Sequence, residues 1–239
     1  MKLCDLTLGT PEANLACDEA LLDLCEAGES DELLRLWALP QYFVVLGYAN
    51  RAATEVNLAF CRQLTIPVLR RCTGGGAVLQ GPGVLNYSLI LRTDAGGPCH
   101  SIPATNKFIL ERHRDALAKL LRAPVEWQGQ TDLAIGGLKF AGNAQRRQRR
   151  FLLFHGSFLL HLDIGLLEKI LPQPSRQPEY RINRSHSEFL INLNVPDRAL
   201  KTALAKAWGA IEPLDPIPFD RITRLAGEKY ALDEWNLKF

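Results

Sequence analysis

Three consecutive glycines, Gly74, Gly75 and Gly76, lie within the segment of clearest chemical interest, Arg70–Ala77, which reads RRCTGGGA. Glycine weakens helices and strands, so a run of three indicates a turn or a place where the backbone approaches a ligand closely. Bare backbone can direct several N–H groups at one anion. The segment lacks the Lys-Ser/Thr ending of a P-loop and precedes a predicted strand, which argues against a dinucleotide-type phosphate loop. A bulge or tight turn without a ligand is the alternative.

A lysine and a histidine stand out in two later predicted strands. Lys139 lies between apolar Leu138 and Phe140, where a lysine usually faces solvent, but facing inward it would suit a phosphate or carboxylate. Small residues two, three and five positions after it leave room for a ligand above the sheet. His155 stands alone in an apolar strand, and such a histidine is more often a core group than a catalyst.

Two charged stretches invite other interpretations. The run Arg146–Arg150 suggests nucleic acid, but no aromatic residues are interleaved with it and the net charge of the chain is only +2. We expect a solvent-exposed hairpin tip there, with a site for a triphosphate or an acidic partner protein as the alternative. Residues 1–34 carry nine acids against one lysine, and we expect a solvated helix face.

The composition is that of an ordinary globular protein, with 239 residues, 47% of them hydrophobic and 23% charged. No apolar run approaches the ~20 residues that span a bilayer, and residues 1–5 lack the apolar stretch of a signal peptide. We therefore expect a cytoplasmic protein with no nucleic-acid or membrane partner. A single domain over residues 1–239, with a helical extension over about residues 170–239, is expected from the length and pattern.

The six cysteines are scattered without a Cys-x-x-Cys pair, so neither a disulfide framework nor a zinc site is expected. Each is expected to be a small buried hydrophobe. Cys72 is the exception, because it lies beside the glycine run.

The elements that must position these residues follow from local signals. Thr10 and Pro11 indicate the start of the first helix, and Gly136-Gly137 can supply the two positive φ angles of a tight hairpin turn. Strands are expected at 32–37, 43–47, 68–71, 77–79, 85–90, 133–135 and 151–160, and helices at 56–65, 103–122, 165–171, 197–210 and 219–230. Clustered strands followed by late helices favour an α+β fold with a mixed, largely antiparallel central sheet flanked by helices.

Five segments, in this order and spacing, resemble the lipoate–protein ligase or biotin ligase-type catalytic domain over about residues 10–165. They are Asn14–Leu21 (NLACDEAL), Val44–Tyr48 (VVLGY), Arg70–Val78 (RRCTGGGAV), Lys139–Gln145 (KFAGNAQ) and His155–Leu159 (HGSFL).

The resemblance implies an enzyme that activates lipoate or octanoate with ATP to an acyl-adenylate and transfers the acyl group to an acceptor lysine. It implies that Lys139 is catalytic and holds the carboxylate and the α-phosphate, and that Gly74–Gly76 wrap the acyl chain and adenylate. Arg70 and Arg71 are candidate phosphate contacts through their fork geometry, although Arg71 could instead be tied into the sheet edge. The other implied binding positions are Thr73, Ala77, Asn86, Gly142, Asn143, Ala144, His155 and Gly156.

The same resemblance implies the cofactors and partners. ATP implies Mg²⁺, for which no ligand set can be chosen from the sequence, and lipoate is the implied substrate. The acceptor would be a lipoyl-carrier protein domain, as in a 2-oxoacid dehydrogenase E2 or the glycine cleavage H protein. Because the chain stops at Phe239, we expect the accessory domain of larger ligases to be missing, and a separate accessory subunit is a further expectation.

The sequence also departs from the family pattern. Gln80-Gly81 replaces the His-Asp of many members, which puts an acid role there in doubt, and Asn86 is two residues beyond the asparagine that some ligases use.

The main alternative is an ATP-independent transferase of the same fold, which moves octanoyl from a carrier-protein thioester. Cysteine-dependent versions place the nucleophile shortly before the lysine strand or after the His-Gly strand, and this chain has no cysteine at either place. A Cys72 thiolate activated by Arg71 would be an unconventional nucleophile. A non-catalytic binding module and a biotin ligase, here without a preceding helix-turn-helix, are the remaining alternatives.

Overall fold

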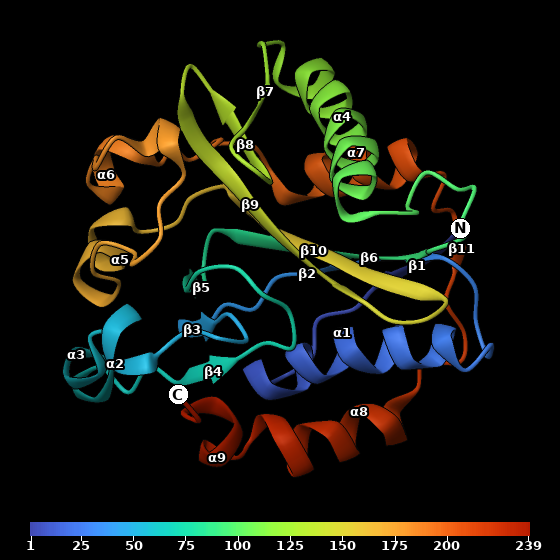
Figure 1. Ribbon diagram of the computed structural model, residues 1–239, viewed down its shortest axis with the longest axis horizontal. Helices are drawn as coiled ribbons and strands as arrows, with labels where there is room; N and C mark the ends of the chain where they lie inside the picture. The colour runs from blue at the N-terminus through green and yellow to red at the C-terminus, as the bar shows by residue number, and fades with distance from the viewer.

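A long mixed sheet forms the centre of the molecule in the computed structural model, which describes residues 1–239 (Figure 1). Its strand order is β11-β1-β2-β6-β10-β9-β8-β7. The strands are β1 (Lys2–Asp5), β2 (Leu33–Trp37), β6 (Val84–Arg92), β7 (Glu126–Gln128), β8 (Asp132–Ile135), β9 (Leu138–Arg147), β10 (Phe151–Leu159) and β11 (Glu212–Pro213). β1 is parallel to β2 and β11, and every other neighbouring pair is antiparallel. The expected α+β fold with a largely antiparallel sheet is confirmed.

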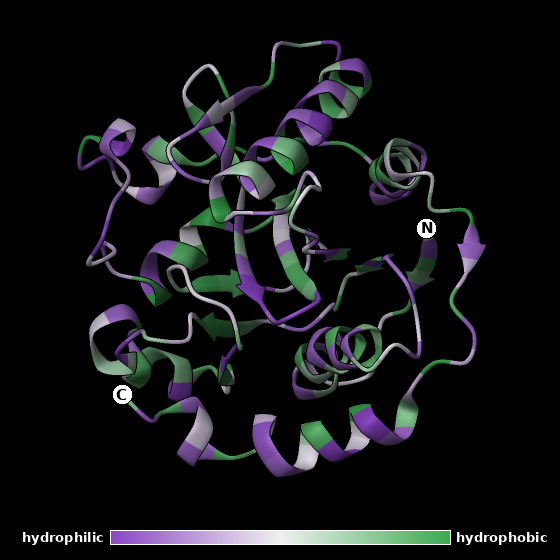
Figure 2. Cartoon of the chain, turned by 45° about the vertical axis from the view of Figure 1, so that its right-hand side comes forward, coloured by the Kyte–Doolittle hydropathy of each residue, from purple (hydrophilic) through white to green (hydrophobic).

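Helices cover both faces of this sheet. The long helix α1 (Pro11–Glu26) lies on one face, with the shorter α8 (Phe219–Leu225) packed against it, and α4 (Ile102–Leu121) and α7 (Asp197–Trp208) lie on the other. Alternate residues of β10 enter the two cores, with Phe151 and Leu153 on the α1 side and Leu152 and Phe154 on the α4 side. Each such buried side chain contributes about 1.5–3 kcal/mol relative to exposure. Figure 2 shows the helices striped in both colours, as helices with one buried face must be.

The first helix begins as expected but does not present a solvated acidic face. Thr10 caps α1, its side chain accepting from the backbone N–H of Ala13 at 3.2 Å. Asp18 and Glu19, however, are only 3% and 5% exposed. The expectation of a solvated face is wrong for these two residues, because distant basic side chains pair with them inside the protein.

A smaller sheet lies beside the large one. It consists of β3 (Phe43–Leu46) between β4 (Val68–Arg70) and β5 (Val78–Gln80). The helix expected at 56–65 is α3 (Leu58–Gln63), and a separate short helix that was not expected, α2 (Ala52–Glu55), precedes it. α3 begins after Asn57, whose side chain caps it by accepting from Phe60 N at 3.1 Å. These helices share a third core with α5 (Ile164–Ile170).

Two hairpins bring the lysine and histidine strands together. Gly136 and Gly137 have φ of 57° and 73°, so the expected tight turn between β8 and β9 is confirmed. β9 then pairs with β10, with His155 opposite Ala144. Arg146 and Arg147 belong to β9 itself, so the expected hairpin tip is confined to residues 148–150.

The C-terminal segment returns to the small sheet. After α8, a helical turn η2 (Ala226–Tyr230) leads to α9 (Asp233–Asn236), which packs beside β4. The remaining short helices, η1 (Glu179–Arg181) and α6 (His186–Phe189), lie in the connection between α5 and α7. None of the helices has the length and apolarity needed to cross a membrane.

Candidate functional site

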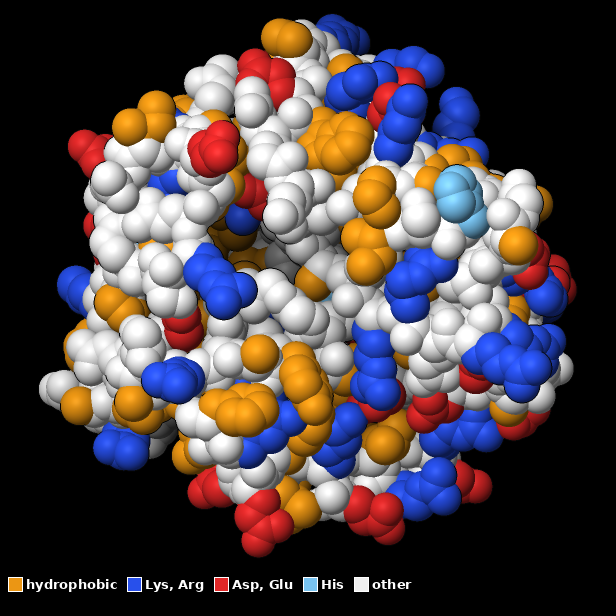
Figure 3. All heavy atoms as spheres, viewed as in Figure 1, with side chains coloured by type: hydrophobic (Ala, Val, Ile, Leu, Met, Phe, Trp, Pro, Cys, Tyr) orange, Lys and Arg blue, Asp and Glu red, His pale blue; other side chains and the backbone are white.

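A cavity of about 1180 Å³ extends between the two sheets, and Figure 3 shows the surface hollowed near the centre of that view. Its walls include the glycine run, parts of β9 and β10, residues 174–178, and His186, Phe189 and Leu190. Of the predicted site residues, the cavity is lined by Arg71, Gly74, Gly75, Gly76, Ala77, Asn86, Lys139, Gly142, Asn143, Ala144, His155 and Gly156. Arg70 and Thr73 are not in its wall.

The glycine run is held in shape by the guanidinium of Arg71. Nη2 donates to the carbonyl oxygens of Gly74 at 2.5 Å and Gly76 at 2.8 Å, and Nη1 donates to Val45 O at 3.3 Å. The side chain is largely buried, and burial lowers the pKa of Arg71 to about 10. Because backbone carbonyl oxygens accept from its N–H groups, Arg71 holds the loop in shape. This agrees with the alternative that Arg71 is tied into the sheet edge.

The three glycines have different reasons to be glycine. Gly75 has a φ of 87°, and a Cβ there would lie 2.8 Å from Arg71 Nη2. A Cβ at Gly47 would lie only 2.0 Å from the carbonyl oxygen of Gly75, so Gly47 must also be glycine. Gly74 and Gly76 would meet nothing within 4 Å. The loop therefore needs Gly75 for its conformation, whereas Gly74 and Gly76 leave space at the cavity surface.

A buried polar chain connects the glycine loop to α1. Arg71 Nε donates to Thr73 Oγ1 at 3.0 Å, and Thr73 Oγ1 lies 2.7 Å from His155 Nε2. His155 Nδ1 lies 3.1 Å from Asp18 Oδ2, and Asp18 Oδ1 accepts from Arg35 Nη1 at 2.5 Å. His155 thus bridges Thr73 and Asp18 through its two ring nitrogens.

The charge on Asp18 is secured by its two partners. Burial would raise its pKa, but the Coulombic attraction of Arg35 and the hydrogen bond from His155 outweigh burial and hold the pKa of Asp18 below its ordinary value. Thr73 is only 1% exposed and does not line the cavity. It can therefore influence a ligand only indirectly, through its contacts with His155 and Arg71.

Lys139 points its ammonium along the surface of the sheet. Nζ lies 2.8 Å from Asp132 Oδ1, and the side chain keeps 27% of its exposure. A Cβ at Gly142 would lie 2.8 Å from Nζ, so glycine at this position leaves room for the ammonium. Lys139 is thus a charge held in the cavity rather than a solvated surface lysine.

Asp132 is a site residue that the sequence analysis missed. Besides Lys139, it accepts a hydrogen bond from the Tyr180 hydroxyl at 2.8 Å. Burial and the charge of Asp132 raise the pKa of Tyr180, so the phenol stays a donor. The only available signal was an acidic residue opening the strand paired with the lysine strand.

Asn143 connects its strand to β6 and to the segment before β8. Asn143 accepts from the Tyr87 hydroxyl at 2.6 Å and donates to Thr131 O at 2.6 Å. A Cβ at Gly156 would be 1.8 Å from Asn143 Oδ1, which explains that glycine. Asn143 therefore fixes the approach to β8.

Asn86 belongs to a second small network at the edge of the cavity. It accepts from Ser157 Oγ at 2.7 Å, and that hydroxyl accepts from Gln80 Nε2 at 2.6 Å. Gln80 Oε1 is buried without a partner. A neutral amide thus stands at the position where the family pattern has histidine.

Arg70 is placed elsewhere, which corrects the expectation that it contacts phosphate. It is fully buried, and its Nη1 donates to the carbonyl oxygens of Gly47, Tyr48 and Asn50 at 2.8–3.0 Å. Nε donates to Trp235 O at 3.1 Å. Successive residues of a strand point to opposite sides, so Arg71 faces the cavity loop while Arg70 faces the C-terminal segment.

Cys72 is the one cysteine in the cavity wall, and it is not an activated thiol. Burial raises its pKa to about 11, and Glu19 adds to that increase. The nearby Arg146 is paired with Glu19 at 2.8 Å. All six cysteines are free and buried, which was expected of the five other than Cys72.

The residues do not form a ready metal centre, because nowhere do three His, Cys, Asp or Glu side chains gather. An Mg²⁺ that accompanied a triphosphate would find Asp132, beside Lys139, as an acidic side chain in the cavity wall.

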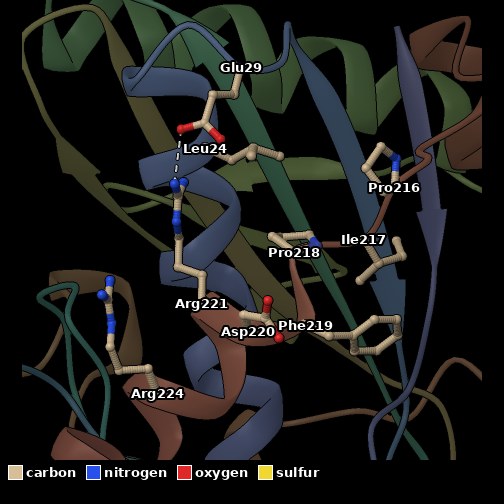
Figure 4. A pocket seen from close by; sticks show the side chains of 9 residues that line it. All are labelled: Leu24, Glu29, Pro216, Ile217, Pro218, Phe219, Asp220, Arg221 and Arg224. Carbon is tan, nitrogen blue, oxygen red and sulfur yellow. Dashed lines mark hydrogen bonds and ion pairs between the residues drawn. The ribbon is translucent and has the colours of Figure 1, made fainter.

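A second hollow, of about 600 Å³, lies between the end of α1 and α8 (Figure 4). Arg221 reaches across it to Glu29 at 2.9 Å. It contains none of the predicted site residues.

Comparison with known proteins agrees with this geometry. The family model of the lipoyl protein ligase A/B catalytic domain matches residues 10–198. The octanoyltransferase LipM of Kyrpidia tusciae is 30% identical over 263 residues, which cover 96% of this chain and 96% of that protein. Lipoate-protein ligase A subunit 1 of Thermoplasma acidophilum is 27% identical over 248 residues, covering 97% of this chain and 94% of that one. A crystal structure of lipoate-protein ligase A bound with ATP superimposes with a TM-score of 0.84 at 25% identity, covering 99% of this chain and 98% of that one.

Proposed function

The chain belongs to the lipoyl protein ligase A/B catalytic domain family, and we propose that within this family of ligases and transferases it acts as an ATP-dependent lipoate–protein ligase. Its substrates would be lipoate or octanoate, ATP and the ε-amine of a lysine on a lipoyl-carrier domain. The observation that carries the proposal is the composition of the cavity, which contains an inward ammonium and a bare glycine loop but no reactive thiol.

The first step joins two anions. The acyl carboxylate attacks the α-phosphorus of ATP and displaces pyrophosphate, giving an acyl-adenylate. Lys139 would neutralise the charge that develops between carboxylate and phosphate, exchanging part of its contact with Asp132 for the substrate oxygens. Gly74 and Gly76, whose surfaces are open, would let the backbone follow the acyl chain and adenylate closely.

The second step needs no enzyme nucleophile. The acceptor amine attacks the acyl carbonyl, AMP leaves, and the amide forms. The protein contributes alignment of the two reactants, which can supply several kcal/mol of the barrier. Mg²⁺ bound to the triphosphate would supply charge neutralisation during the first step.

The apolar part of the cavity suits an alkyl chain. Leu15, Trp37, Val45 and Val78 line it. An acyl tail there would be shielded from water while its carboxylate pointed toward Lys139.

A second candidate, the octanoyltransferase, is favoured by the relatives named octanoyltransferase LipM. It would move an acyl group from a carrier-protein thioester without ATP. If a cysteine were the nucleophile, Cys72 is the one the cavity offers, and its raised pKa leaves few molecules with a thiolate near neutral pH.

One pair of assays separates the candidates. We expect lipoate- or octanoate-dependent exchange of pyrophosphate into ATP, and Cys72→Ser should retain it within about twofold because the thiol has no role in the ligase. Acyl transfer from a carrier-protein thioester without ATP, lost in Cys72→Ser, would instead establish the transferase. The assays should include a candidate accessory subunit, since the Thermoplasma relative is named as one subunit of its ligase.

A further inference from the structure

Arg181 is a buried cation without an ion-pair partner. It is 4% exposed, its Nη2 has no hydrogen-bond partner, and Nε donates to Arg184 O at 3.0 Å. It takes part in no ion pair. Burial and the charge of Arg184 lower the pKa of Arg181, and Asp132 and Glu168 offset only part of that decrease. Burying an unpaired charge is costly, so a guanidinium in this state requires a reason.

The side chain lies in the wall of the same cavity as Lys139. Its Cζ stacks 4.9 Å from the ring centre of Phe189. The segment around Arg181 is bonded to the β8–β9 hairpin that carries Lys139. Arg184 Nη2 donates to Gly137 O at 3.2 Å, and Ile191 N donates to Lys139 O at 2.9 Å. Arg181 is therefore held in place by its neighbours, while its own outer N–H groups are unused.

The nearby carboxylates are already engaged. Asp132 bonds Lys139 and Tyr180, and Glu168 accepts from the backbone N–H and hydroxyl of Ser187 at 2.8 and 2.9 Å. Arg184 adds a second positive charge, since its Cζ lies 5.1 Å from the same Phe189 ring. None of these carboxylates forms an ion pair with Arg181, so its guanidinium has no direct anionic partner.

Of the other cations that line the cavity, Arg51 and Arg176 are exposed to solvent, and the remaining three already have partners. Lys139 and Arg146 have carboxylate partners, and Arg71 bonds backbone carbonyls. We propose that Arg181 is the cation of a phosphate-binding subsite at the end of the cavity formed by η1 and α6. A planar guanidinium with unused N–H groups matches the oxygens of a phosphate.

The phosphate could come from either of two substrates. In the ligase proposed above, on which this identification rests, it is the β,γ-phosphate group of ATP that leaves as pyrophosphate. In a transferase it is the phosphodiester of the pantetheine arm that carries the thioester. The subsite itself is common to both, and the choice of probe distinguishes them.

The test is calorimetric titration of the full chain with inorganic pyrophosphate and, separately, with pantetheine 4′-phosphate. Arg181→Met keeps the length and stacking of the side chain but removes the charge. The matched control is Arg112→Met, which removes a guanidinium stacked 4.6 Å from Phe108 and 4.5 Å from Trp208 outside the cavity. Melting temperatures of all variants show whether the fold is kept.

We expect pyrophosphate binding to weaken about tenfold or more in Arg181→Met and to be unchanged in Arg112→Met. If Arg181→Met does not fold, Arg181→Lys, which keeps the charge without the fork, should fold and still bind pyrophosphate measurably more weakly. A loss confined to pantetheine 4′-phosphate would support the subsite and count against the ligase. Equal affinity of folded wild type and variant for both probes, or no binding of either probe to wild type, would overturn the subsite, and ATP–pyrophosphate exchange by that same wild type would leave the ligase intact.

Discussion

At the scale of single residues, the ammonium of Lys139 is the centre of the proposed chemistry. Asp132 holds it at 2.8 Å in the absence of substrate, so the lysine is oriented before two anions arrive. A cation that is already in place stabilises developing charge without reorganising at the moment of reaction. Its partner Asp132 also receives Tyr180, which connects the lysine to the segment that carries Arg181.

Replacing Lys139 by methionine should reduce lipoate-dependent ATP–pyrophosphate exchange by roughly 10²–10³-fold, because no other group takes over its charge. Lys119→Met, on the exposed face of α4, is the control and should exchange at the wild-type rate. Exchange at more than about a tenth of the wild-type rate in a folded Lys139→Met protein would remove the lysine from the proposed chemistry.

Asp18 makes a prediction about pH and stability. Its pKa is lowered in the folded protein, so its stabilising contribution is present above the unfolded pKa of about 3.9 and is lost as pH falls through the folded value. Asp18→Asn leaves Arg35 buried without a counter-charge and should lower the free energy of unfolding by about 3–5 kcal/mol near neutral pH.

Urea unfolding between pH 7 and about pH 3 measures both effects. The wild type should lose stability below about pH 4, and Asp18→Asn should show a smaller acid-dependent loss. A variant as stable as wild type at neutral pH, with the same acid dependence, would contradict the assigned pairing.

At the scale of elements, the glycine loop depends on its supports. Arg71 fastens its carbonyls from one side, and Gly47 of the neighbouring turn lets the Gly75 carbonyl approach. The loop reaches His155 through Thr73 and thereby α1 through Asp18. Three segments distant in sequence thus fix one short bend.

Gly75→Ala and Gly74→Ala form a matched pair within this loop. Alanine at 75 must adopt a φ of 87° and approach Arg71 Nη2 to 2.8 Å, whereas alanine at 74 meets nothing within 4 Å. We expect a loss of ATP–pyrophosphate exchange of about tenfold or more for Gly75→Ala and a smaller loss for Gly74→Ala. The reverse order would show that space for the ligand, rather than backbone conformation, explains the run.

Local signals predicted the elements well, and long-range partners explain the differences. The Thr10 cap and the Gly136-Gly137 turn depend on neighbouring residues and were predicted correctly. The burial of Asp18 and Glu19 was not, because their partners lie 17 and 210 residues away along the chain. Arg181 resembles any polar loop residue until the fold buries it.

At the scale of the whole molecule, the C-terminal segment holds α1 and the small sheet together. Arg70 bonds Trp235 and the turn after β3, and Lys229 pairs with Glu19 of α1 at 2.6 Å. The wall of the cavity is therefore braced from outside by residues that do not face it.

Arg70→Met tests this division between bracing and binding. Losing these buried hydrogen bonds should lower the melting temperature by about 5 °C or more. The KM for ATP should change by less than about threefold, because the guanidinium does not face the cavity. A large rise in KM with an unchanged melting temperature would restore Arg70 as a phosphate contact.

The most direct test of the central claim is pyrophosphate exchange into ATP by the wild-type chain, with and without lipoate or octanoate, and with a candidate accessory subunit added. Exchange that requires the fatty acid and disappears in Lys139→Met is the predicted result. If the wild type gives no exchange under any of these conditions, yet moves octanoyl from a carrier-protein thioester to a lipoyl-carrier domain without ATP, the chain is a transferase and the ligase proposal is contradicted.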